Sequence, residues 1–246
     1  MRSVCTTRAG GVSTAPFDSL NLGDHVGDAV ASVVDNRTVL QRVISAKPAF
    51  LKQVHGVQVV SLTPETAHGT EADACITTQS GLACTIMVAD CLPVLFTNRA
   101  GSFVAAAHAG WRGLAGIDAV NGVGVLETTF KSIQTTQTAA SDILVWLGPC
   151  IGKSQFEVGG EVRDAFAARD AAALRYFTPS AAGKWLADLS GLARQRLKAL
   201  GITQIYGNDG SAAWCTVSEI SRFFSHRRDS VALGGSGRMA ACIWLA

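Results

Sequence analysis

The 246-residue sequence lacks an excess of charge of either sign and lacks a long apolar run. Its 21 basic and 19 acidic residues give a net charge of +2, too small to indicate nucleic acid or an acidic membrane surface as partner. The longest apolar candidate, LACTIMVADCLPVLF, is interrupted by Asp90 and is shorter than the roughly 18 residues that a membrane-spanning helix needs. We therefore expect no nucleic-acid partner and no membrane partner.

Also missing are an apolar leader, a pairing pattern among the cysteines, and any linker, low-complexity tract or repeat. The start, MRSVCTTRAGGVS, has no apolar stretch of the kind that secretory signal peptides carry. Seven cysteines, an odd number at irregular spacings, are typical of a reducing compartment. With 48% hydrophobic and 16% charged residues, the sequence predicts a cytoplasmic globular protein with a single domain over 1–246, a monomer or weak homodimer.

The apolar pattern that is present predicts an α+β fold. Because strand-like runs are joined as hairpins and helical patterns fall between groups of them, we expect mixed sheets covered by helices. The expected strands are 83–90, 91–98, 102–109, 142–149, 202–207, 221–228 and 238–245, with a hairpin turn at 98–101. The expected helices are 114–130, 159–169 and 184–201, the last being the most clearly amphipathic.

Three segments carry residues for which an apolar core has no use. The stretch AAAHAGWRGLAG, residues 105–116, places a histidine, an indole and a guanidinium between glycines where a strand meets a helix. A second histidine, His55, lies in the loop QVHG. Between them, Asp90 and Cys91 interrupt two apolar strands, which costs free energy unless both are paired or bound to something. Since neighbours in a regular strand face opposite sides, we expect a bulge or a strand end there.

The spacing of His55, Cys91 and His108 does not by itself form a metal-binding motif, because no C-x-x-C or H-x-x-x-H chelate is present. Two packed core histidines and a buried thiol are therefore the alternative to a three-ligand site.

The ordered motifs LKQVHG, ADCLPVLF, AAAHAGWRGLAG, WLGPCIG, FFSHRRD and GRMAACIWL resemble the multicopper polyphenol oxidase (laccase-like) family. Its bacterial members are also called peptidoglycan editing factors, and the family is related to multifunctional purine nucleoside phosphorylases. The resemblance covers nearly the whole chain, from TTRAGGVS to the final IWL. It implies a layered α/β/β/α sandwich resembling the cytotoxic necrotizing factor-like hydrolase fold. Family members usually carry a further segment before Val4, so we expect a first strand that is shortened or missing.

The resemblance implies that the histidine of QVHG, the cysteine of ADC and the histidine of HAGWRG bind zinc. These residues are His55, Cys91 and His108. Zinc accepts imidazole nitrogen and thiolate readily, and three protein ligands leave a fourth position for water or substrate, as in catalytic sites. Copper is the alternative ion, because it outcompetes zinc in most sites of this donor type.

The function implied is that of a zinc-dependent purine nucleoside enzyme. It would cleave adenosine, inosine, guanosine and methylthioadenosine with phosphate, and it would also deaminate adenosine. Purine nucleoside and phosphate are therefore the expected partners. We expect Arg112 and Arg8 to bind phosphate. The alternative for Arg112 is to brace the following helix by pairing with a carboxylate such as Asp118. We expect Asp90 to act as acid or base, or to orient a ligand or loop.

Further substrate contacts are expected from polar or aromatic residues near these motifs. Gln53 precedes His55, and Trp111 is placed either to stack on a purine or to join the core. The N-terminal segments TTRAGGVS and SLNLGDH are polar and flexible, so we expect Arg8 and Asn21 to line the same pocket, together with Gly10, Gly11 and Ser13. His226 is expected either near the site or packed in a strand.

Two other functions remain open. The family name implies a copper-dependent polyphenol oxidase, although five histidines are few for a multinuclear copper cluster. The second is a cysteine hydrolase acting on cell-wall precursors, in which Cys91 is the nucleophile and His108 or His55 the base. Metal content separates these functions, since a zinc-bound thiolate is not free to attack.

Overall fold

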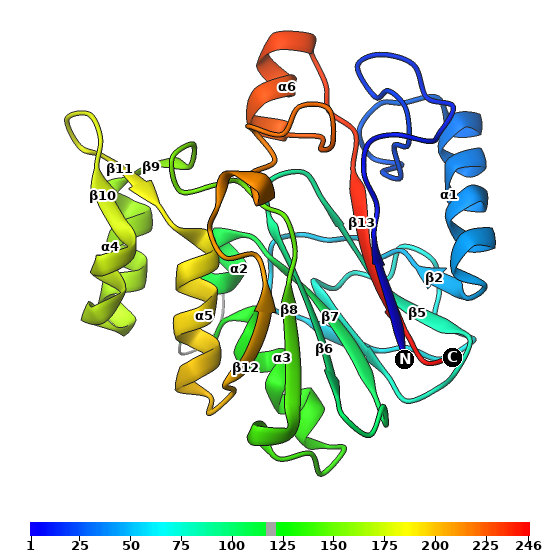
Figure 1. Cartoon of the computed structure of the whole chain (residues 1–246), viewed down its shortest axis with the longest axis horizontal. Coiled ribbons are helices and arrows are strands. Elements are labelled where there is room, and N and C mark those ends of the chain that lie inside the picture. The colour runs from blue at the N-terminus through cyan, green and yellow to red at the C-terminus, as the bar shows by residue number, and fades with distance from the viewer. Residues whose placement is uncertain (117–121) are drawn as a thin grey trace.

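The structure is a computed structural model that describes residues 1–116 and 122–246, and a pair of β-sheets forms its centre (Figure 1). The four-stranded sheet has the order β1–β13–β5–β2, with β1 (Arg2–Cys5), β2 (Lys47–Ala49), β5 (Leu82–Val88) and β13 (Met239–Trp244). The six-stranded sheet has the order β12–β8–β6–β7–β4–β3, with β3 (Val59–Ser61), β4 (Ala74–Thr77), β6 (Leu92–Asn98), β7 (Val104–Ala109), β8 (Ile143–Leu147) and β12 (Gln204–Gly207). Each sheet contains parallel and antiparallel neighbours, so the expectation of mixed sheets is confirmed.

The two sheets pack face to face because side chains alternate along each strand. On β5, Cys84 and Ile86 belong to one buried cluster with Leu95 of β6 and Val104 of β7. The alternate residue Met87 belongs to a different cluster on the outer face of the same sheet. The central strands β4, β5, β6, β7 and β13 are buried along their whole length, which explains their nearly continuous apolar runs.

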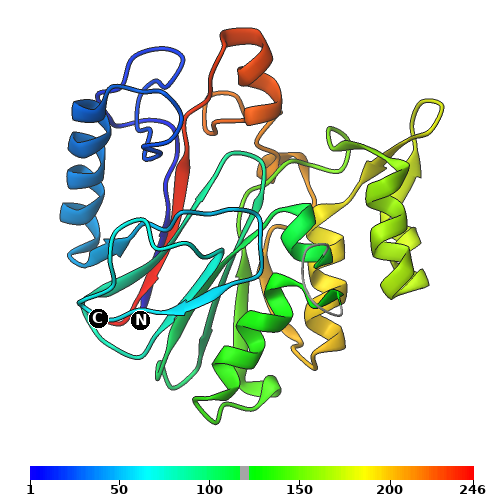
Figure 2. The same cartoon turned by 180° about the vertical axis from the view of Figure 1, so that it is seen from behind.

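Helices cover the two outer faces. α1 (Val30–Ile44) packs on the four-stranded sheet through Leu40 and Ile44. α3 (Val125–Gln134) and α5 (Leu189–Ala199) contribute to the cluster on the outer face of the six-stranded sheet. Figures 1 and 2 show α1 on one side of the paired sheets and α3 and α5 on the other. The order of layers is thus helix, sheet, sheet, helix.

A small third sheet extends from one end of the molecule beside α4, and two further helices flank the large sheets (Figure 1). This sheet has the order β10–β11–β9, with β9 (Glu157–Gly159), β10 (Phe177–Pro179), β11 (Lys184–Ala187) and α4 (Gly160–Arg169) beside it. α2 (Trp111–Ala115) follows β7, and α6 (His226–Leu233) precedes β13. No helix in the described residues is long and apolar enough to cross a membrane.

Three expected elements differ from the structure. The helix expected over 114–130 is not continuous: α2 ends at Ala115, where Gly116 has φ +75°, and α3 begins at Val125 after the extended Gly124. Residues 117–121 lie outside the described residues. The helix expected over 184–201 begins only at Leu189, because the residues before it form β11 and the Asp188 side chain caps α5 by accepting from the Gly191 N–H.

The segment 221–228 was expected to be a strand, and this is wrong. Phe223 and Phe224 suggested a strand, but they are buried core residues in a segment without regular structure. α6 then begins at His226, where the Ser225 side chain accepts from the Arg228 N–H as an N-cap.

The hairpin agrees with the expectation, whereas the first strand, expected to be shortened or missing, is present with four residues. β1 is present and pairs antiparallel with β13 from Arg2 opposite Trp244 to Cys5 opposite Ala241. β6 and β7 pair antiparallel across the expected turn at 98–101. β5 and β6, by contrast, belong to different sheets, so the chain crosses between the sheets at Asp90 and Cys91.

Candidate functional site

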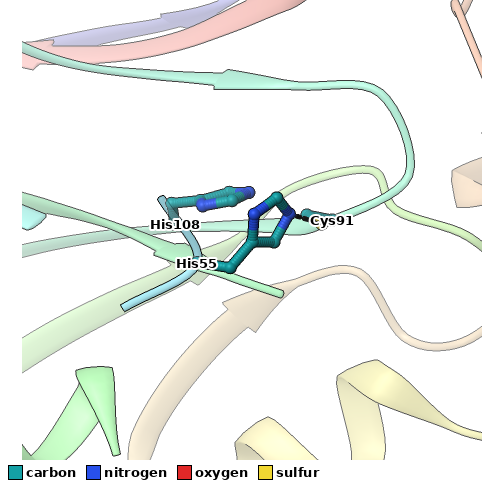
Figure 3. A group of neighbouring side chains, drawn as sticks. All are labelled: His55, Cys91 and His108. Atoms are coloured by element: carbon teal, nitrogen blue, oxygen red, sulfur yellow. Dashed lines mark hydrogen bonds between the residues drawn. The ribbon is translucent and has the colours of Figure 1, made fainter. Parts of the chain in front are cut away.

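Three side chains from separate parts of the sequence meet at this crossing. His55 lies in the loop between β2 and β3, Cys91 directly before β6, and His108 near the end of β7. Figure 3 shows their side chains pointing toward one another. One nitrogen of each histidine and the Cys91 Sγ all lie within 4.8 Å of one another, and Sγ is 3.7 Å from the His55 Nε2. The two imidazole rings meet edge to face with centroids 4.8 Å apart.

Asp73, a fully buried carboxylate just before β4, fixes the backbone of His55 and the side chain of His108. Its Oδ1 accepts from the His55 N–H at 2.9 Å and from the His108 Nδ1 at 2.8 Å. Its Oδ2 accepts from the N–H groups of Val54 at 3.1 Å and Gly56 at 2.7 Å. Because Nδ1 of His108 carries the proton of this bond, Nε2 is the nitrogen left to face Cys91 and His55.

The backbone is strained at two positions of the site. His55 has φ +62° and Asp90 has φ +95°, values that residues other than glycine rarely adopt. The three N–H bonds to Asp73 hold His55 in this conformation. Strain of this kind persists only where the surroundings enforce it, and it concentrates at functional sites.

Cys91 and His108 shift each other's pKa in opposite directions. Burial by itself would raise the pKa of the Cys91 thiol, but His108 and His55 outweigh it and lower this pKa to about 6. Burial would lower the pKa of His108, but Cys91 and Asp73 raise it to about 9. Cys91 is therefore a thiolate near neutral pH, the form that binds metals and attacks electrophiles.

The three side chains open onto a cavity of about 440 Å³. Its lining includes four more residues singled out from the sequence, namely Gln53, Asp90, Trp111 and His226. The remaining lining residues are His25, Met87, Val88, Ala89, Ile151, Phe156, Leu189, Arg227 and Arg238. A volume of this size is ordinary for a small-molecule site.

Asp90 and Gln53 line the cavity, but their polar atoms are bonded to the protein. Asp90 Oδ1 accepts from the Thr216 hydroxyl at 2.6 Å, and Oδ2 accepts from the Arg227 N–H at 2.7 Å. Gln53 bonds both the N–H and the C=O of Met87 at the end of β5. Asp90 thus attaches α6 to the sheet crossing, and Gln53 attaches the QVHG loop to β5.

Arg8, Asn21 and Arg112 are not among the described residues that line the cavity. The guanidinium of Arg8 bonds the carboxylate and carbonyl of Asp18 and stacks over Phe224. Asn21 is fully buried and bonds Gly23, Asp28 and the N–H of Arg238. These two residues organise the N-terminal loops instead, and so do Gly10, Gly11 and Ser13 through contacts with Ser19, Asn36 and Asp28.

Arg112 is exposed on α2, with its guanidinium 5.0 Å from the Trp111 ring centroid. Asp118, its alternative partner, lies outside the described residues. Trp111 is half-buried and both lines the cavity and packs against the core, so the two expectations for it are not exclusive.

Sequence reasoning missed Asp73, His25, Arg227 and Arg238. Asp73 had a detectable signal, since it is a single acid directly before the apolar segment ACIT, as Asp90 is before another. Arg238 had a similar signal, because it is a charged residue directly before the apolar strand near the C-terminus. No local pattern distinguishes Arg227 or His25 from surface residues.

The glycine at position 110, two residues after His108, is required by its close contacts with His55 and Cys91. A Cβ at this position would lie 2.8 Å from His55 Cδ2 and 3.1 Å from Cys91 Sγ. We predict that Gly110→Ala, by overpacking this contact, weakens metal binding about ten- to a hundredfold. Titration against a chromophoric chelator measures this. Gly160→Ala is the matched control, because a Cβ there meets nothing within 4 Å. Unchanged metal affinity in Gly110→Ala would contradict the prediction.

Comparisons with known proteins agree with the motif resemblance. The family model described as multi-copper polyphenol oxidoreductase laccase matches residues 2–246. A purine nucleoside phosphorylase of Pseudomonas aeruginosa is 50% identical over 246 residues, covering 100% of this chain and 93% of the relative. Purine nucleoside phosphorylase YfiH of Escherichia coli is 49% identical over 242 residues, covering 98% and 92%. A crystal structure of a Neisseria meningitidis protein matches with a TM-score of 0.88 at 43% identity, covering 99% and 93%.

Proposed function

Because the chain belongs to the multi-copper polyphenol oxidoreductase laccase family, and because its relatives above are named purine nucleoside phosphorylases, we propose that it is a zinc-dependent purine nucleoside phosphorylase that also deaminates adenosine. The observation that carries the proposal is the convergence of His55, Cys91 and His108 on one cavity. Phosphorolysis replaces the bond between ribose C1′ and the base by a C1′–O bond to phosphate, and the base leaves with a proton.

The donor set fits zinc. Two imidazole nitrogens and one thiolate are ligands that zinc prefers, and in tetrahedral sites such atoms lie about 3.3–3.7 Å apart. Cys91 Sγ and His55 Nε2 are already 3.7 Å apart. The bond from His108 Nδ1 to Asp73 is the contact that metal-bound imidazoles usually make through their other nitrogen. Small side-chain rotations therefore suffice to complete a three-ligand site.

A zinc ion held by these residues would supply Lewis-acid chemistry, lowering the pKa of a water molecule so that hydroxide is available for deamination at neutral pH. The protein's own residues bind and orient the nucleoside. Trp111 and Phe156 are the large aromatic side chains on the cavity and suit a flat purine. Asp90 is assigned a positioning role, since both its carboxylate oxygens hold other segments in place.

Oxidation of phenols at copper has less support. A multinuclear copper site needs several groups of ligands, whereas within 1–116 and 122–246 a single group of three or more His, Cys, Asp or Glu ligands converges. We attribute any oxidase activity to copper in place of zinc at His55, Cys91 and His108. Oxidase activity should then rise only on copper loading.

A cysteine hydrolase is the second candidate, because Cys91, His108 and Asp73 have the arrangement of nucleophile, base and orienting carboxylate. The implied likeness to cytotoxic necrotizing factor-like hydrolases supports the same candidate, with cell-wall precursors as substrates. In this case the protein would be active without metal.

The proposal predicts two separable products. Incubated with adenosine and phosphate, the protein should release adenine and ribose 1-phosphate, and without phosphate it should convert adenosine only to inosine. Chromatography of both reactions, repeated with inosine, guanosine and methylthioadenosine, measures this. Phosphate-independent release of free base, or no turnover of any of the four nucleosides, would contradict the proposal.

A further inference from the structure

Two arginines reach the cavity from different elements, and in the described part of the chain no carboxylate bonds either guanidinium. Arg227 lies in the first turn of α6, and Arg238 directly precedes β13. Both line the cavity with His55, Cys91 and His108. Within residues 1–116 and 122–246, neither arginine forms an ion pair with a carboxylate.

Both side chains are nevertheless held in place. Nη1 of Arg238 donates to the carbonyls of Ser236 and Gly237, at 2.8 and 3.1 Å. Nη1 of Arg227 donates to the carbonyl of Glu157 at 3.2 Å, and its guanidinium lies 5.8 Å from the Phe156 ring centroid. In the described part of the chain, the Nε and Nη2 groups of both arginines have no further hydrogen-bond acceptor. Each guanidinium is anchored at one nitrogen, and its other N–H groups remain to bind a ligand.

Arg238 is half-buried and Arg227 is exposed. Several other half-buried or buried arginines of this protein pair with acids, although Arg194 bonds only backbone carbonyls. Arg37 pairs with Asp24, and Arg196 with Glu127 at 2.9 Å. Partial burial makes a cation costly unless a counter-charge is close. Burial lowers the pKa of Arg238, while the nearby charges of Cys91 and Asp90 oppose this. Neither of these groups bonds the Arg238 guanidinium, so a bound anion would supply the counter-charge that this cation has no direct contact with.

We propose that Arg238 and Arg227 form the subsite for the phosphate group, in place of Arg112 and Arg8. The inference rests on the proposed function for its assignment to orthophosphate, the second substrate of phosphorolysis. The shared chemistry is a phosphate dianion, which a guanidinium binds through two parallel N–H···O bonds. A phosphate group attached to a nucleoside has the same chemistry, so the test must distinguish the two sources.

The test measures binding of inorganic phosphate and of adenosine 5′-monophosphate by calorimetry, using the full-length zinc-loaded protein. Arg238→Met and Arg227→Met keep the aliphatic stem and remove the charge. Each should weaken orthophosphate binding about ten- to a hundredfold, as expected for one charge-assisted hydrogen bond. Arg222→Met is the matched control, because Arg222 also bonds a backbone carbonyl and stacks on a ring, but off the cavity. Zinc content and melting temperature are recorded for every variant.

The possible outcomes test the phosphate subsite independently of the proposed function. Weaker orthophosphate binding in both cavity variants, with zinc retained, supports the subsite even if no nucleoside is cleaved. Unchanged orthophosphate affinity in both would overturn it, even if phosphorolysis is observed. Loss of affinity in Arg112→Met instead, or binding of adenosine 5′-monophosphate without binding of orthophosphate, would also overturn it. Since Arg227 lies on α6 and Arg238 before β13, misfolding of one variant still leaves the other to decide.

Discussion

Replacing Cys91 by alanine is expected to reduce bound zinc from about one ion per chain to below about a tenth. The substitution removes the only thiolate of the site and leaves two imidazoles, too few for a stable zinc complex. The fold should survive, because Cys91 is only half-buried and alanine at such a position costs about 1 kcal/mol or less. Elemental analysis after exhaustive dialysis, with a thermal melt, measures both effects.

Cys5→Ala is the control for this experiment. Cys5 is also half-buried, but burial raises the pKa of its thiol to about 12, so it stays protonated and inert. Its replacement should leave zinc content unchanged. If Cys91→Ala retained about one zinc per chain, Cys91 would not be a ligand. If neither protein held zinc and the wild type were active, the cysteine hydrolase would be the better account.

Replacing Asp73 by asparagine is expected to weaken zinc binding about ten- to a hundredfold, the usual effect of removing a carboxylate behind a metal-bound histidine. Asparagine has one acceptor oxygen, whereas Asp73 accepts four hydrogen bonds with two. The N–H groups of Val54 and Gly56, or those of His55 and His108, therefore lose their partner. The unfolding free energy should fall by about 1–3 kcal/mol as well.

Affinity for zinc and melting temperature must both be measured, because a stability loss alone would indicate a merely structural role. Asp188→Asn is a suitable comparison, since Asp188 also accepts a backbone N–H but at the start of α5. It should lower stability without changing zinc affinity. Equal zinc affinity in Asp73→Asn and wild type would show that Asp73 holds the loop without tuning His108.

Mixed sheets covered by helices were predictable because the central strands are buried on both faces, whereas the order of the layers came from the family resemblance. The long apolar runs of these strands, such as 83–88 and 92–97, have no other stable place than between packed layers. The assignment of β5 and β6 to different sheets was not predictable. The residues on both sides of Asp90 are equally apolar, so hydropathy gives no sign that the chain changes sheet there. Asp188 caps α5 after residues that pair as β11, although the pattern indicated a helix from 184. Ser225 caps α6 after two phenylalanines that indicated a strand but are buried in the core without strand pairing.

The candidate site was predictable where motifs carry it and not where the tertiary structure builds it. His55, Cys91 and His108 stand in recognisable motifs, and the structure brings them together. Arg112 stands four residues after His108, yet it is exposed, because His108 belongs to β7 and on α2 the neighbouring Trp111 takes the face toward the cavity. Arg238 is 130 positions from His108 by number and shares its cavity. Such convergence depends on the strand order, which local patterns do not encode.

The central claim is that phosphate-dependent cleavage of purine nucleosides requires the metal site. The most direct measurement is a zinc titration of chelator-stripped protein, assayed with adenosine and phosphate at each step. The account predicts no release of adenine at zero zinc, and a linear increase that stops at about one zinc per chain. Full activity of the stripped protein, or activity that does not follow zinc occupancy, would contradict it.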